Sequence, residues 1–73
     1  MKFQYKYLEL HIDEFGCSLT DLEEQTTVKL SGSPTDYGPG LLKTFNHLGQ
    51  DGWELAGFSQ GAVFEYIFKR QLN

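Results

Sequence analysis

The segment Leu48-Gly49-Gln50-Asp51-Gly52-Trp53-Glu54-Leu55-Ala56-Gly57 decides how the second half of the chain folds. A glycine follows an apolar residue, and a second glycine precedes the only tryptophan, which opens a new apolar run. Glycine readily adopts the left-handed conformation that ends a helix, so we expect Gly49 to occupy that position. The segment therefore predicts a helix that ends at Leu48 and a strand that begins at Trp53.

Upstream of this segment, residues 39–48 have the pattern of an amphipathic helix. Pro39 suits the first turn of a helix, where its missing N–H is not needed. Leu41, Leu42, Phe45 and Leu48 follow at the spacing of one helical face. We expect this apolar stripe to pack on a sheet.

Downstream, residues 53–59 and 62–70 read as two strands of a hairpin that turns at Gln60-Gly61. A two-residue turn places Gly57 opposite Phe64, and opposed residues share a face of the sheet. A three-residue turn would break this parity. The two-residue register puts the following side chains on one face: Trp53, Leu55, Phe64, Tyr66 and Phe68.

The first strand is expected over residues 3–12, which contain no glycine or proline and many aromatic and branched side chains. Period-two alternation puts Phe3, Tyr5 and Tyr7 on one face and Leu8, Leu10 and Ile12 on the other. We expect the aromatic face to lie under the helix. The predicted core is then Tyr5, Leu41, Phe45, Leu48, Trp53, Leu55, Phe64, Tyr66 and Phe68.

The middle of the chain leaves two alternatives open. Thr20-Asp21-Leu22-Glu23 matches a capping box, which favours a short helix over residues 21–25. The β-branched residues in 26–30 then favour an extended segment, so the insertion supplies a short helix or a strand. Residues 31–38 have the composition of a loop. The fold class predicted is α+β in one domain over residues 1–73, with a three-stranded antiparallel sheet in strand–helix–hairpin order, one main helix and a short helix or strand in the middle insertion.

The size, cysteine content and charge of the chain restrict its function. A chain of 73 residues has a small core, which many proteins of this size supplement by oligomerisation. A single cysteine, Cys17, and the lack of a signal peptide or long apolar run predict a cytoplasmic protein without a membrane span. The net charge of −4 disfavours direct nucleic-acid binding, which needs a positive surface.

Acidic residues are concentrated in the stretch between Lys6 and Lys29, which contains no other lysine or arginine. This run forms either a solvated surface or a patch that docks on a partner with a basic surface. The candidate acidic patch comprises Glu9, Asp13, Glu14, Asp21, Glu23 and Glu24.

Three blocks of the sequence resemble a known family. They are Phe3-Gln4-Tyr5-Lys6-Tyr7-Leu8, the stretch from Phe45 to Leu55 with its Leu-Gly-x-x-Gly-Trp-Glu-Leu signature, and Tyr66-Ile67-Phe68-Lys69-Arg70. The pattern is similar to that of very short bacterial and phage proteins of unknown function, which end in a Phe-Lys-Arg strand. The chain departs from the family in Phe45, where leucine is usual, and in a longer insertion over residues 13–38. The resemblance implies a small strand–helix–hairpin fold. It supplies neither an activity nor functional residues, because no activity is established for the family.

No group of residues carries a recognisable catalytic or cofactor motif. Cys17 and His11 lie six residues apart, and a catalytic pair would require the thiol to be exposed and activated. Glu54 and Glu65 fall close together on one sheet face in the expected register, where surface carboxylates usually serve solvation. His11, His47 and Cys17 lack the paired spacing of a metal site. We therefore predict no enzymatic activity, no cofactor and no bound metal.

The expected function rests on the second face of the predicted sheet, which lies opposite the aromatic face. One short helix covers only one of the two faces, so this second face is left exposed. Large exposed apolar patches usually mark interfaces. The sequence therefore predicts a non-enzymatic interaction module that works as a homo-oligomer through an apolar sheet face, or through an open strand edge. The alternative is a small acidic inhibitor or ligand-sequestering protein that binds a basic partner or a small nucleotide. The candidate interface residues are Leu10, Ile12, Phe58, Val63 and Ile67.

Overall fold

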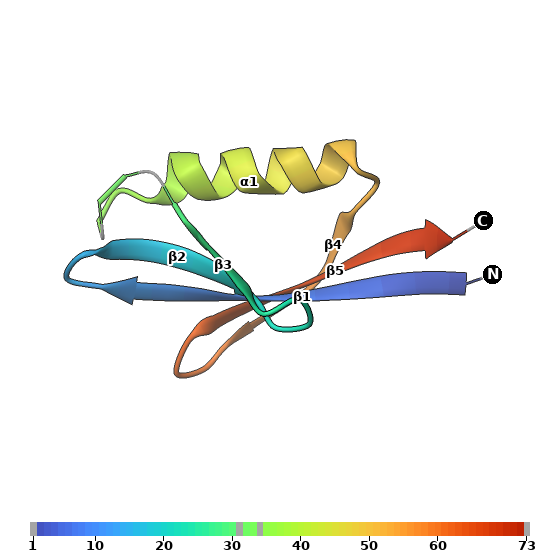
Figure 1. Cartoon of the computed structure of the whole chain (residues 1–73), viewed down its shortest axis with the longest axis horizontal. Coiled ribbons are helices and arrows are strands. Elements are labelled where there is room, and N and C mark those ends of the chain that lie inside the picture. Colours follow the sequence, from blue (N-terminus) through green and yellow to red (C-terminus); the bar gives the residue numbers. More distant parts are fainter. Residues whose placement is uncertain (1, 31, 34, 73) are drawn as a thin grey trace.

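The computed structural model describes residues 2–30, 32–33 and 35–72 and contains one antiparallel sheet with one helix. The strands form in the order β3-β2-β1-β5-β4. Helix α1 lies across one face of the sheet, and the other face is left open (Figure 1). The elements in chain order are β1 (Lys2–Asp13), β2 (Gly16–Asp21), β3 (Thr26–Lys29), α1 (Gly38–Gln50), β4 (Glu54–Gln60) and β5 (Phe64–Leu72).

The α+β class and the antiparallel sheet agree with the sequence, but the prediction of three strands is wrong because the sheet has five. The middle insertion supplies the two additional strands, β2 and β3. The extended alternative for residues 26–30 is the one that holds, and the helix over 21–25 does not form. Asp21 does accept the backbone N–H groups of Glu23 and Glu24, at 3.0 and 3.2 Å. These bonds close the turn between β2 and β3, because an aspartate can cap a turn as readily as a helix.

The faces of β1 are reversed relative to the sequence prediction. Leu10 faces the helix and is 1% exposed, whereas Tyr5 points to the open face and is 59% exposed. The reason lies in strand pairing, because β1 is hydrogen-bonded to β2 on one side and to β5 on the other. On β2, Cys17 and Leu19 lie on the face that Leu10 shares, and Ser18 lies on the other. Only the face with Leu10 is therefore apolar across both strands, and the helix packs there.

The β4–β5 hairpin has a three-residue turn rather than a two-residue turn. Gln60 pairs with Phe64, so Phe58 lies opposite Tyr66 on the helix face. A β-bulge between Leu55 and Gly57 then shifts the alternation of β4 side chains between the two faces by one residue. Leu55 thus remains on the helix face as expected, but it is half-exposed at the sheet edge.

The buried core contains more aliphatic residues than the sequence predicted. Tyr5 and Leu55 do not belong to it. Of the other predicted members, Trp53 and Phe68 are buried, and Leu41, Phe45, Leu48, Phe64 and Tyr66 pack against the core. The additional buried residues are Leu8, Leu10, Cys17, Leu19 and Leu30.

The corner between α1 and β4 is fixed by Arg70. The helix runs through Gly49, and the left-handed residue is Gly52, with φ of 90°. The guanidinium carbon of Arg70 lies 4.4 Å from the centroid of the Trp53 ring. Its nitrogens donate to the carbonyl of Asp51 at 3.2 Å and to the side-chain oxygen of Gln4 at 2.7 Å. One cation thus ties the corner to β1 and β5.

The two glycines at this corner are expected to respond to alanine in opposite directions. Gly49→Ala should raise the free energy of unfolding by up to about 1 kcal/mol, because alanine favours helix and nothing lies within 4 Å of the new Cβ. Gly52→Ala should lower it by about 1–2 kcal/mol, because alanine resists positive φ. Urea denaturation measures both. A loss of stability in Gly49→Ala would instead place the left-handed residue at Gly49.

Candidate functional site

A series of aromatic rings in mutual contact leads from the core to the outer edge of β4. Phe45 on α1 packs edge-on against Phe68 and Tyr66, with centroids 5.1 and 5.0 Å apart. Phe58 on β4 continues the series, at 5.3 Å from Tyr66 and 6.0 Å from Phe64. Phe58 is nevertheless 55% exposed. The apolar core therefore reaches the surface at this edge of the sheet.

The backbone of β4 is also open, because β4 pairs with β5 on one side and is the last strand of the sheet. Leu55 is 51% exposed and lies on the same face as Phe58. Residues 54–60 include no lysine, arginine or proline, the residues that usually protect an edge strand. We call Leu55, Phe58 and the outer backbone of β4 the β4 edge surface.

The opposite edge of the sheet is better protected. Strand β3 has four residues and ends in Lys29. Short edge strands with lysine resist pairing with another chain. On β4 the corresponding protection is limited to the bulge at Ala56 and to Glu54, whose carboxylate lies 3.6 Å from Lys69 Nζ. Of the two edges, β4 is the one suited to pairing.

The five interface residues predicted from the sequence do not form one surface. Leu10 is buried in the core, Ile12 lies at the end of β1, and Phe58 lies at the β4 edge. Val63 lies in the hairpin turn, and Ile67 is half-buried on the open face.

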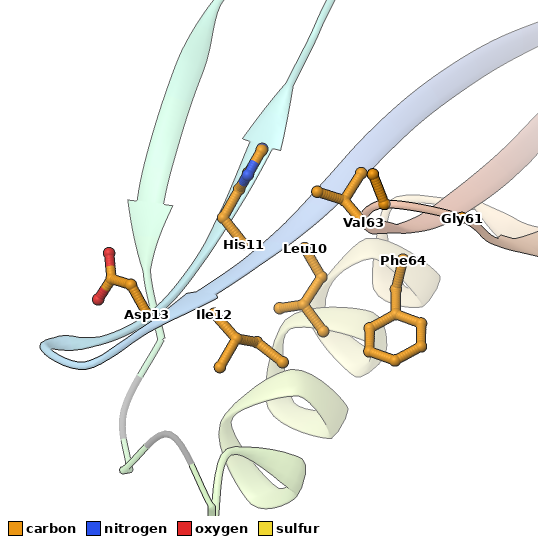
Figure 2. Close-up of a pocket in the computed structure, with 8 residues that line it drawn as sticks. Leu10, His11, Ile12, Asp13, Gly61, Val63 and Phe64 are labelled. Carbon is orange, nitrogen blue, oxygen red and sulfur yellow. The ribbon is translucent and has the colours of Figure 1, made fainter.

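The end of β1 and the hairpin turn enclose a notch of about 300 Å³. Figure 2 shows Leu10, Ile12 and Phe64 directed toward the helix side of this notch, with Val63 on the turn. Ile67 does not line it. The notch thus brings together only part of the predicted set, namely Leu10, Ile12 and Val63.

The open face carries aromatic residues that have charged partners. Lys69 Nζ lies 5.1 Å from the centroid of the Phe3 ring. A hydrogen bond to Glu65, aided by desolvation, raises the pKa of Tyr7 to about 12. His11 lies 3.4 Å from Glu9 on the same face. This mixture is typical of a solvated sheet face, so the open face is a weaker interface candidate than the β4 edge surface.

The acidic residues do not gather into one patch. Asp21 is buried, and its carboxylate lies 2.6 Å from Lys6 Nζ. Burial alone would raise the pKa of Asp21, but Lys6 and two backbone N–H donors together lower it. The remaining charges are split: Asp13 and Glu14 lie near the β1–β2 turn, Glu23 and Glu24 lie in the β2–β3 turn, and Glu9 lies on the open face.

The other candidate groups in the sequence, Cys17 with His11 and Glu54 with Glu65, are also separated. Cys17 is buried on the helix face, with Sγ 3.8 Å from the carbonyl of Ser33, whereas His11 lies on the open face. Glu54 pairs with Lys69, and Glu65 lies opposite Ser59. Among residues 2–30, 32–33 and 35–72, no three histidine, cysteine, aspartate or glutamate side chains gather as a metal site.

Comparison of the chain with protein-family models, with curated proteins and with solved structures found no match. The resemblance to the family of very short bacterial and phage proteins stays a prediction. In the part of the chain that the structure describes, no helix has the length and apolar character needed to cross a membrane.

Proposed function

We propose that this protein is a non-enzymatic, cytoplasmic interaction module that assembles as a homodimer through the β4 edge surface. The observation that carries the proposal is the aromatic series that ends in the half-exposed ring of Phe58 beside an unpaired strand edge. The buried free thiol of Cys17 supports a reducing compartment.

Pairing of two β4 strands would cover the exposed apolar side chains of this surface and would also hydrogen-bond its open backbone. Antiparallel pairing about a two-fold axis joins two sheets into one and gives hydrogen-bond partners to the open backbone N–H and C=O groups. The same contact would bury the side chains of Leu55 and Phe58 of each protomer against the partner protomer. Ala56, Gly57 and Ser59 are small, so a second strand can approach closely.

The test is the mass in solution by light scattering at high micromolar concentration. We expect twice the 8.4 kDa of the single chain. Phe58→Glu and Leu55→Lys should each reduce the mass to that of one chain, because a charge would be buried in the contact. Two variants are used because Phe58 also packs on Tyr66, and circular dichroism verifies that each remains folded.

The matched control is Leu42→Lys, which adds the same charge at a leucine on α1 that is 60% exposed. This variant should keep the mass of the wild type. A wild-type mass of 8.4 kDa throughout the concentration range, or an unchanged mass in both β4 variants, would contradict the proposal.

The alternative function, a small acidic inhibitor or ligand-sequestering protein, has less support. It depends on a continuous acidic surface, and Asp21 is neutralised by Lys6 while the other carboxylates lie at separate places.

A further inference from the structure

A second apolar feature lies at the other side of the molecule, between α1 and β3. It is a cleft of about 750 Å³ whose walls include Val28 of β3 and Leu42 and Leu48 of α1. Val28 and Leu42 are both more than half exposed. The cleft exists because Phe45 anchors the helix over β5, so the β2–β3 side of the helix face is left partly uncovered.

A smaller cavity of about 130 Å³ lies against the first and shares three of its lining residues, Val28, Thr44 and Leu48. It is also lined by Leu8 and Leu19 of the sheet. The two cavities together make an apolar site that extends from the surface toward the core. Mostly apolar clefts of this size, with a few polar groups at the rim, are typical of small-molecule sites.

The rim of the cleft carries the positive charge of Lys43 and no carboxylate of the described residues lines the larger cavity, although the whole chain carries −4. Lys43 and His47 are the ionisable residues that line the larger cavity. They lie four residues apart on α1 and are therefore neighbours on its surface. Neither makes an ion pair within the described residues. The carboxylate in the smaller cavity, Asp21, is already bound to Lys6.

We propose that this cleft binds an anionic amphiphile, with one acyl chain along the apolar walls and a carboxylate head at Lys43 and His47. The lining runs along α1 from Pro39 to Gln50, roughly 16 Å at the helical rise, which suits a chain of about a dozen carbon atoms. Asn46 and Gln50 add amide donors at the same rim. The site lies at the edge opposite to β4, so it does not depend on the proposed dimer.

The experiment is a titration with dodecanoate below its micelle concentration, followed by calorimetry and by methyl resonances. We expect saturable binding of one molecule per chain and shifts of the methyl groups of Val28, Leu42 and Leu48. Dodecyltrimethylammonium has the same chain with a cationic head, and butyrate has the same head with a short chain. Both should bind at least about tenfold more weakly, a difference of roughly 1.4 kcal/mol.

Two variants with the same change of charge distinguish the effect of a charge at the rim from the effect of the net charge of the protein. Lys43→Glu should weaken dodecanoate binding by about tenfold or more, which is roughly 1.4 kcal/mol. Lys29→Glu makes the same change on the open face of β3 and should leave binding unchanged. Equal affinity for the two head groups, unchanged binding in Lys43→Glu, or shifts centred on Leu55 would overturn the proposal. So would a reduced mass in Leu42→Lys, because a second chain would then cover the cleft.

Discussion

Phe68→Ala is expected to lower the free energy of unfolding by about 3–5 kcal/mol, the usual cost of removing a buried phenylalanine ring. Phe68 is among the largest fully buried side chains, and the helix packs on it through Phe45. A chain of this length has roughly 4–11 kcal/mol of stability in total, at 0.05–0.15 kcal/mol per residue. The variant should therefore be close to unfolding at room temperature, as urea denaturation would measure.

The matched control is Tyr5→Ala, which removes an aromatic ring from the opposite face of the same sheet. Tyr5 is largely exposed, so its loss should cost about 0.5 kcal/mol or less, as for other surface substitutions. A larger loss in Tyr5→Ala than in Phe68→Ala would mean that the helix covers the other face.

Asp21→Ala is expected to destabilise the fold by about 3–5 kcal/mol, because it leaves the charge of Lys6 without its partner in a nearly buried site. The side chains of Lys6 and Asp21 are mostly buried, and the alanine also removes the acceptor for the N–H groups of Glu23 and Glu24. Thermal and urea unfolding measure the loss. Lys6→Met combined with Asp21→Leu should recover much of it, because neither charge then remains. Equal losses in the double variant and in Asp21→Ala would contradict a role for the ion pair.

The ion pair of Asp21 and Lys6 also makes the free energy of unfolding depend on pH. The pKa of Asp21 is lowered in the folded protein, since Lys6 and the backbone donors outweigh the effect of burial. The stabilisation from this carboxylate is therefore complete above the unfolded pKa, which is about 3.9. It is lost as the pH falls through the lower folded value. Asp21→Asn should lack this component of the acid-induced loss of stability that the wild type shows.

Local patterns in the sequence predicted α1 and β1 to within two residues at each end. The strong apolar spacing of Leu41, Phe45 and Leu48 and the uninterrupted run of β1 are signals of short range, so they can be recognised without the rest of the chain. The extended alternative for β3 rested on the same kind of signal.

The face of β1 that packs on the helix required knowledge of strand pairing. Both faces of β1 are apolar, and the choice between them is made by β2, where Cys17 and Leu19 alternate with Ser18 and Thr20. That alternation is visible in the sequence and could have identified β2. The three-residue turn and the bulge at Ala56 have no such signal, because glycine and alanine are compatible with several turn lengths.

The candidate interface depended on these long-range features. The sequence named Phe58 but grouped it with Leu10 and Ile67, which the observed register places in the core and on the open face. The sequence places Leu55 in the core, because nothing local indicates that β4 is an edge strand. Edge position follows from strand order, which pairs segments far apart in the chain.

Isotope-filtered NOE spectroscopy on a mixture of labelled and unlabelled protein tests the β4 contact most directly. We expect intermolecular contacts from the side chains of Leu55 and Phe58, together with backbone contacts between two β4 strands. Intermolecular contacts confined to Phe3, Tyr5 and Ile67 of the open face, or a complete lack of them at high micromolar concentration, would contradict assembly through the β4 edge surface.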